Sequence, residues 1–176
     1  MRFATDNLVY GPTNNPYDVS RIPGGSSGGA VSIIAAGGSA FDIGTDTGGS
    51  IRTPAHFHGI CGLKPTNGRV PRTGHIPFDE IPAVEALTVA GPLARYVSDL
   101  GQLLPILSGP DWVDPSVTAP AFEPAPPLKL ETLKVAYFIN GISSPDSDTV
   151  ALLEAVLSAV DQLYRSTSEA RLPNLE

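Results

Sequence analysis

Three serines set among glycines are the residues of this chain whose type and spacing could do chemistry. Ser26 and Ser27 lie within the run 24–29 (GGSSGG), and Ser50 follows two further glycines. A serine hydroxyl becomes a nucleophile for acyl transfer when a neighbouring group takes its proton and backbone N–H groups stabilise the oxyanion that forms. Glycines permit the tight turns that present such N–H groups. The two clusters are therefore interpreted as two parts of one active site.

The stretch that joins the two clusters predicts one unit of helix and strand. Apolar spacing predicts a helix over residues 28–36, and residues 41–46 (FDIGTD) predict a short buried strand. Ser50 is then expected to open a second short helix, with Pro54 in its first turn. Both clusters would thus stand at helix N-termini, where free N–H groups and the helix dipole stabilise negative charge.

Three interpretations of these glycines compete on pattern alone. The first is a Gly/Ser loop that only turns the chain. It is a good explanation of an isolated GGSSGG and a poor explanation of two such turns around one helix and strand. A nucleophile elbow matches formally, because 24–28 and 25–29 both satisfy G-x-S-x-G, but residues 17–23 (YDVSRIP) do not form the buried strand that an elbow follows. A phosphate-binding loop would need the Lys-Ser/Thr ending that is absent here.

Six other titratable side chains could take part in acid–base chemistry: His56, His58, His75, Asp79, Glu80 and Glu85. The first two histidines bracket an aromatic residue in a small-residue stretch, which favours packing or surface roles. The carboxylates lie in a proline-rich loop, where a solvent-facing position is the usual case. The single cysteine, Cys61, is expected to pack beside the glycine-rich region, as a buried free cysteine commonly does.

Composition excludes several classes of protein. With 176 residues, of which 41% are hydrophobic, the chain can bury the core of one ordinary domain. A net charge of −7 and scattered basic residues argue against nucleic acid or an anionic membrane as a partner. No apolar run reaches the roughly 18–20 residues of a membrane span, and the first residues lack the pattern of a signal peptide. One cysteine excludes an internal disulfide and fits a reducing compartment. We therefore predict a cytoplasmic protein without a metal or other cofactor.

The second half of the chain predicts two more helices and one strand. Residues 98–107 predict a helix capped by Ser98 and bent or shortened by Pro105, and a proline- and alanine-rich irregular connection follows. Residues 134–139 predict a strand and 150–164 an amphipathic helix, behind the capping candidates Asp146, Ser147 and Asp148. No strand is expected after that helix. Its apolar stripe would then need a partner from an earlier element or from chain outside this sequence.

The stretch 5–73 resembles the amidase signature family. The matching strings are TDN at 5–7, GPTNNP at 11–16, PGGSSGG at 23–29, GTDTGGSIRTPA at 44–55 and GICGLKPTNGRVPRTG at 59–74, and the segment 91–111 is similar to a core helix region of the family. The resemblance implies an α/β fold, a three-layer sandwich with a mixed β-sheet between helices. The corresponding division is a family core at 1–118, an irregular connection at 119–131, and a strand plus amphipathic helix of the same domain at 132–176.

The resemblance also implies a Ser-Ser-Lys catalytic triad. By position in the motifs, Ser50 is similar to the nucleophile and Ser26 to the bridging serine, which is held in a cis peptide. The oxyanion hole would comprise the N–H groups of Thr47, Gly48, Gly49 and Ser50. Hydrogen bonds from Ser27, Asp46 and Arg52 would brace the site.

The catalytic lysine is the part of the triad that this sequence does not match. In the family it lies well upstream of the GGSSGG loop, on a segment expected to precede Met1, and no lysine occurs here before Lys64. Lys64 matches a structural segment, and Lys129 and Lys134 lie far downstream, so none is expected to replace the base. The family's fold is also much longer than this chain. We therefore interpret the sequence as a middle fragment, incomplete at both ends.

The implied activity of the parent protein is amide-bond hydrolysis through an acyl-serine, which converts a carboxamide to a carboxylate plus ammonia or an amine. Two alternatives stay open: a catalytically inactive fragment or partner-binding remnant, and an amidotransferase A-type subunit that releases ammonia from glutamine. The GHIP segment at 74–77 looks closer to stand-alone amidases. The expected partner is a small-molecule amide, with self-association through exposed sheet edges, and aryl, aliphatic and fatty acyl amides are not separated.

Overall fold

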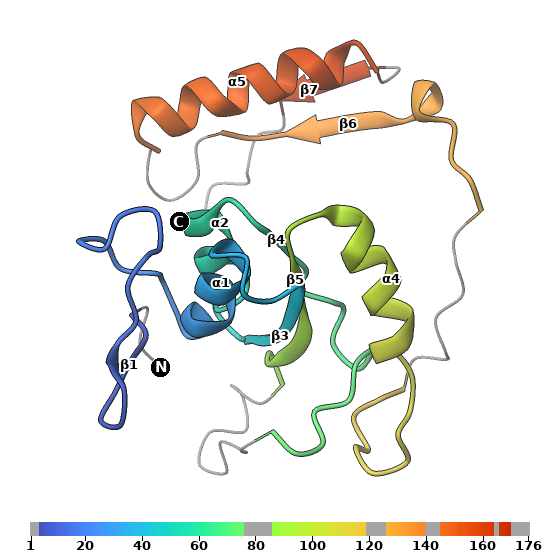
Figure 1. Cartoon of the computed structure of the whole chain (residues 1–176). Coiled ribbons are helices and arrows are strands. Elements are labelled where there is room, and N and C mark those ends of the chain that lie inside the picture. Colours follow the sequence, from blue (N-terminus) through green and yellow to red (C-terminus); the bar gives the residue numbers. More distant parts are fainter. Residues whose placement is uncertain (1–3, 76–85, 119–125, 140–144, 164–165, 170–176) are drawn as a thin grey trace, which may run out of the picture. The chain divides into compact units, whose positions relative to one another are not determined.

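A computed structural model describes residues 4–75, 86–118, 126–139, 145–163 and 166–169. The chain forms two compact units, Met1–Glu123 and Pro124–Glu176 (Figure 1). The loop carboxylates Asp79, Glu80 and Glu85, and most of the expected connection, lie outside the described residues. The division into a core and a tail of one domain therefore stays a prediction.

The first unit is built around a three-stranded antiparallel sheet. A short hairpin, β1 (Asp6–Asn7) and β2 (Gly11–Pro12), comes first. There follow helix α1 (Gly28–Ala35), strand β3 (Phe41–Asp46), helix α2 (Arg52–His58), strand β4 (Cys61–Gly62), strand β5 (Val89–Ala94) and helix α4 (Val97–Leu107). The sheet order is β3-β5-β4, and the β3–β5 ladder runs from Phe41 opposite Ala94 to Asp46 opposite Val89.

Helices cover both faces of this sheet. Every residue of β5 is buried, and because successive side chains of a strand point to opposite faces, both faces must be covered. Helices α1 and α2 pack together on one side of the sheet, and α4 packs against β5 from the other (Figure 1). The core cluster joins α1, α2 and β5 and consists of Val31, Ile34, Ile51, Ala55 and Leu93. This core holds the two serine-bearing segments against one sheet.

Helix α1 matches its expected span, while two other predictions for this unit were wrong in detail. Strand β3 is an edge strand with Phe41 and Ile43 each 48% exposed, because no described strand pairs with its outer side. Helix α2 begins at Arg52, since Ser50 lies in the preceding turn and Ile51 is the N-terminal cap residue.

Helix α4 also starts one residue earlier than expected. Tyr96 has the extended backbone of a cap residue, so Ser98 falls in the first turn and makes no capping hydrogen bond. Pro105 lies inside the helix, which continues to Leu107. The expected apolar face is present, because Leu100 is buried and the following leucines are half-buried.

The second unit contains a 3-10 turn η1 (Leu130–Thr132), strand β6 (Lys134–Tyr137), helix α5 (Ser147–Asp161) and strand β7 (Ser166–Glu169). Asp146 caps α5 by accepting a hydrogen bond from the Thr149 N–H at 2.9 Å, as predicted. The predicted stripe of α5 is its half-buried side: Val150, Leu153, Leu157 and Val160. The last expected member of that stripe, Tyr164, lies outside the described residues.

The expectation that no strand follows the last helix was wrong. Residues 166–169 (STSE) form β7, which pairs in parallel with β6 and contacts α5. This segment has no alternation of apolar and polar residues, so its pairing with β6 decides its structure and local pattern does not. Helix α5 therefore has a neighbouring strand within its own unit.

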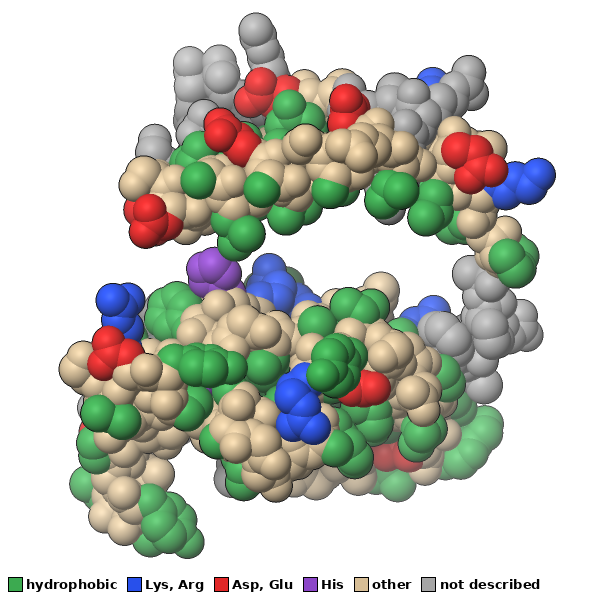
Figure 2. All heavy atoms as spheres, turned by 45° about the horizontal axis from the view of Figure 1, so that its top comes forward, with side chains coloured by type: hydrophobic (Ala, Val, Ile, Leu, Met, Phe, Trp, Pro, Cys, Tyr) green, Lys and Arg blue, Asp and Glu red, His purple; other side chains and the backbone are tan. Residues whose placement is uncertain are grey.

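Exposed apolar side chains lead to a prediction about association. Leu8 and Tyr10, at the tip of the β1–β2 hairpin, are almost fully exposed, Phe41 and Ile43 on the β3 edge are each 48% exposed, and Figure 2 shows hydrophobic side chains across the visible surface. Exposed edges and apolar patches favour association between copies. We expect light scattering to give a mass above 18.3 kDa that rises with concentration, and Ile43→Lys on the β3 edge to reduce it. A mass of one chain at every concentration, with a sharp cooperative melt, would contradict this.

In the part of the chain that the structure describes, no helix is both long and apolar enough to cross a membrane.

Candidate active site

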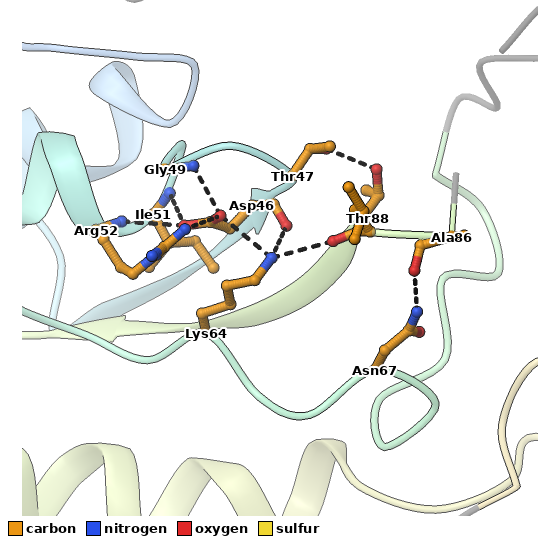
Figure 3. A network of polar contacts seen from close by, with 10 residues as sticks. Asp46, Thr47, Gly49, Ile51, Arg52, Lys64, Asn67, Ala86 and Thr88 are labelled. Carbon is orange, nitrogen blue, oxygen red and sulfur yellow. Dashed lines mark hydrogen bonds and ion pairs between the residues drawn. The ribbon is translucent and has the colours of Figure 1, made fainter. Parts of the chain in front are cut away.

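The turn that follows β3 is organised around the carboxylate of Asp46. This side chain is fully buried. It accepts hydrogen bonds from the backbone N–H groups of Gly49 (2.9 Å), Ile51 (3.1 Å) and Arg52 (3.3 Å), as Figure 3 shows. Gly49 has φ of +122°, which side-chain-bearing residues rarely adopt, so glycine is required where the chain doubles back. The carboxylate thus fixes the turn that carries Ser50.

Two cations surround that carboxylate. Arg52 donates from Nε and Nη2, each at 3.0 Å to one carboxylate oxygen, and the Lys64 ammonium lies 3.3 Å from Oδ1. Burial by itself raises the pKa of Asp46, but the hydrogen bonds from Arg52 and the backbone N–H groups outweigh it and hold that pKa well below its usual range. The same contact raises the pKa of Arg52. The site therefore keeps a buried, ionised carboxylate.

This depressed pKa predicts acid sensitivity. The unfolded-state pKa of an aspartate is about 3.9, so the stability that Asp46 contributes is complete above that pH and is lost as pH falls through the lower folded-state pKa. A hydrogen bond from Thr73 similarly lowers the pKa of Asp111 to about 2. Titration of Asp46 and Asp111 should therefore leave the denaturant midpoint unchanged between about pH 5 and 8. The midpoint should decrease when the pH is lowered below about 4. In an Asp46→Asn chain the denaturant midpoint should decrease less at acid pH. An equal decrease would contradict the assignment of this acid sensitivity to Asp46.

The two serine clusters meet directly. The Ser27 N–H donates to the Ser50 carbonyl oxygen at 3.2 Å, which ties the loop 24–28 to the turn 46–50. Ser50 is 7% exposed and Ser27 is half-buried, whereas Ser26 is exposed. The peptide bond between Gly25 and Ser26 is cis. The structure thus brings together the segments that sequence reasoning assigned to one site.

The expected oxyanion-hole N–H groups are not equivalent. The turn 47–50 presents them in succession, and the Gly49 N–H already donates to Asp46. The Gly49 N–H therefore holds the turn in this structure. The remaining N–H groups of the expected oxyanion hole are those of Thr47, Gly48 and Ser50.

Thr5 braces the loop that carries Ser26 and Ser27, a contact that sequence reasoning missed. Its Oγ1 donates to the Gly24 carbonyl oxygen at 2.9 Å and accepts from the Gly28 N–H at 3.1 Å. A Cβ atom at Gly28 would overlap the Thr5 hydroxyl, so the glycine is needed for this close approach. The only sequence signal was the TDN string, which lies about twenty residues before the loop it supports.

The family model described as Amidase matches residues 1–176. The chain belongs to the amidase family. The A-type subunit of glutamyl-tRNA(Gln) amidotransferase from Moorella thermoacetica is 37% identical over 183 residues, which cover 100% of this chain and 36% of that protein. The AtzE subunit of 1-carboxybiuret hydrolase from a Pseudomonas species is 46% identical over 126 residues, 72% of this chain and 26% of that protein.

Solved structures of the same family confirm the predicted α/β fold class. A peptide amidase bound to the inhibitor chymostatin matches with a TM-score of 0.80 at 32% identity, over 93% of this chain and 34% of that one. A 6-aminohexanoate cyclic dimer hydrolase matches with a TM-score of 0.80 at 30% identity, over 96% of this chain and 36% of that one. This amidase-family chain thus spans about a third of the length of the relatives it matches.

Two histidines of this amidase-family chain, His56 and His58, make their contacts within helices α1 and α2. His58 is buried and links α2 to α1: its Nδ1 lies 2.9 Å from the Pro54 carbonyl oxygen and its Nε2 lies 3.1 Å from the Ser32 hydroxyl. His56 contacts the neighbouring Phe57 ring, with ring centroids 6.0 Å apart. The predicted packing or surface roles therefore hold for these two residues, since His58 is buried and His56 is exposed. Cys61 lies half-buried in β4, with its thiol 3.6 Å from the Arg95 carbonyl oxygen.

Replacing Thr5 with valine should loosen the loop 24–28. Valine keeps the shape but leaves the Gly24 carbonyl and the Gly28 N–H without this partner, which should cost about 1–3 kcal/mol of unfolding free energy. Urea denaturation measures the loss, with Thr66→Val, at an exposed threonine, as the matched control. Equal midpoints for the two variants would show that the Thr5 bonds do not hold the loop.

Proposed function

We propose that the protein carrying this sequence hydrolyses a carboxamide through an acyl-serine intermediate on Ser50. The observation that carries the proposal is the hydrogen bond from the Ser27 N–H to the Ser50 carbonyl oxygen, which joins the glycine-serine loop to the turn shaped by Asp46. Membership of the amidase family supports it.

In this mechanism the Ser50 hydroxyl oxygen attacks the carboxamide carbon, and the hydroxyl proton passes to Ser26. N–H groups of the turn 47–50 stabilise the tetrahedral oxyanion. The C–N bond then breaks, and the nitrogen leaves as ammonia or an amine after it receives a proton through Ser26. Water attacks the acyl-serine ester, which releases the carboxylate and restores Ser50. Ser27, Asp46 and Arg52 act by holding the turn and not by touching the reacting atoms.

Lys64 is not the base in the proposed mechanism. The Lys64 ammonium lies against the Asp46 carboxylate and two backbone carbonyl oxygens, so its N–H groups are committed to acceptors. The base proposed here is the upstream lysine that the family resemblance implies, outside these 176 residues.

A glutamine-hydrolysing amidotransferase subunit is the second candidate. It is favoured by the 37% identity, across the whole chain, to the A-type subunit of glutamyl-tRNA(Gln) amidotransferase. The chemistry at Ser50 would be the same, with glutamine as the carboxamide. A small-molecule amide is the partner in both cases, and a cytoplasmic location stays a prediction from composition.

Ammonia release from a panel of carboxamides tests the proposal and separates the candidates. The purified protein that carries this sequence together with the upstream lysine is incubated with an aryl amide, a short aliphatic amide, a fatty acyl amide and glutamine. We expect release from at least one substrate, its loss in Ser50→Ala, and its retention in Ser98→Ala, a matched change at an exposed serine. Release from glutamine alone favours the amidotransferase. Release by that protein but not by the folded 176-residue chain favours the inactive-fragment alternative for the chain alone, and no release from any substrate by the longer protein counts against the proposal.

A further inference from the structure

Lys64 makes a set of contacts that its place in the sequence does not explain. It lies two residues after β4, and its side chain reaches the end of β3 (Figure 3). Its Nζ donates to the carbonyl oxygens of Asp46 at 2.6 Å and Leu87 at 3.0 Å, and it lies 3.3 Å from Asp46 Oδ1. Three oxygen acceptors match the three N–H groups of an ammonium.

These acceptors lie where the central strand pair stops. The last pair of the β3–β5 ladder is Asp46 opposite Val89, the first residue of β5. Leu87 lies two residues before Val89. Past this pair, among the residues that the structure describes, no ladder hydrogen bond joins β3 and β5. Lys64 links the two segments here by binding the backbone carbonyl oxygens of Asp46 and Leu87. The Thr47 and Thr88 hydroxyls, 2.6 Å apart, add a second link at the same level.

Lys64 and Arg52 hold the same carboxylate in different ways. The Arg52 side chain is 56% exposed and donates to the carboxylate oxygens of Asp46. The Lys64 side chain is 27% exposed and contacts both the carboxylate and the backbone carbonyl oxygen of Asp46. Lys64 therefore fixes the main chain and the side chain of Asp46 together. The N–H groups of Gly49 and Ile51, which donate to that carboxylate, are fixed in turn.

We propose that Lys64 is a positioning residue that anchors the turn 46–50 to the start of β5 and so sets the place of Ser50 and its neighbouring N–H groups. The catalytic part of this inference rests on the proposed function, whereas the anchoring of the turn does not. Lys64 touches neither substrate nor reacting atoms, and acts through Asp46.

Backbone amide exchange tests the anchoring directly. The 15N-labelled 176-residue chain is compared with Lys64→Met, which keeps the apolar stem and removes the ammonium. We expect exchange at Gly49 and Ile51 to speed up by about tenfold or more, since a hydrogen bond to a charged group is lost. Exchange at Val31 and Ile34 in α1 should stay within about twofold, because the core is not altered. Lys129→Met, the same change at an exposed lysine of the second unit, should leave Gly49 unchanged.

The Lys64→Arg variant keeps the charge and guards against a Lys64→Met chain that fails to fold. A guanidinium presents its donors in a planar fork and cannot direct three of them at converging acceptors. We expect Gly49 exchange in Lys64→Arg to be faster than in the unaltered chain. Exchange equal to that of the unaltered chain would overturn the proposal, as would acceleration in Lys64→Met spread equally over Gly49 and α1.

The rate of Ser50 modification by a fluorophosphonate probe tests the catalytic part. In Lys64→Met we expect the rate at saturating probe to fall by about tenfold, the equivalent of one such hydrogen bond, with little change in the half-saturating probe concentration. An unchanged rate would overturn the catalytic part. If Ser50 takes no probe even in the protein that also carries the upstream lysine, the proposed function fails, and the amide exchange still decides whether Lys64 anchors the turn.

Discussion

Replacement of Asp46 by alanine is expected to lower the free energy of unfolding by about 3–5 kcal/mol, the range found when one partner of a buried ion pair is removed. Asp46 is fully buried and accepts from three backbone N–H groups and from Arg52. Alanine leaves those donors without their acceptor and leaves Arg52 and Lys64 without their counter-charge. Because small domains are stable by only about 5–15 kcal/mol, this loss would remove a large share of the stability of the fold.

Denaturant titration followed by circular dichroism measures that loss. Asp42→Ala is the matched control, because Asp42 is on the same strand, is half-buried, and accepts only from the Ile43 N–H at 2.7 Å among the contacts of its side chain described here. We expect the control to lose less than about 1 kcal/mol. If Asp46→Ala were no less stable than Asp42→Ala, the turn would not depend on its carboxylate.

Replacement of Ser26 by alanine is expected to slow acylation of Ser50 by about 10²–10⁴-fold, the usual contribution of a group that transfers a proton in the transition state. Ser26 is exposed, so its hydroxyl has no packing role in the described structure and the variant should melt with the unaltered chain. A large kinetic effect without a stability effect is the signature of a proton relay.

The rate of fluorophosphonate modification measures this effect, and Ser98→Ala serves as the control at an exposed serine of α4. The pH dependence of the rate should also change in Ser26→Ala, since a different group must then take the proton. A Ser26→Ala chain modified as fast as the control would remove Ser26 from the mechanism.

Local sequence pattern was enough to predict the helix and the strand that lie between the two serine clusters, and the buried side of α5. Helix α1 and the half-buried stripe of α5 follow from the spacing of apolar residues, which sets which side of a helix is buried. Strand β3 occupies its expected residues but is not buried as expected. Strand β7 could not be found in this way, because STSE has no apolar alternation and forms by pairing with β6. The exposure of β3 likewise depends on which strands lie beside it.

The support of the site was harder to predict than its reactive residues. Thr5 contacts the loop across 19 and 23 residues of sequence, and Lys64 reaches Asp46 and Leu87 across 18 and 23. No short-range period records such contacts. Sequence reasoning gave Lys64 a structural role only, and the fold shows the contacts by which it can hold the turn. The roles of Ser26 and Ser50 came from family resemblance and stay proposals.

Mapping of a fluorophosphonate adduct by peptide mass spectrometry tests the central claim most directly. The protein that carries this sequence together with the upstream lysine is incubated with the probe and digested, and its peptides are searched for the modified serine. We expect one adduct, on Ser50, which is absent from Ser50→Ala and present in Ser98→Ala. An adduct on another serine, or modification of Ser50→Ala to the same extent as the unaltered chain, would contradict it.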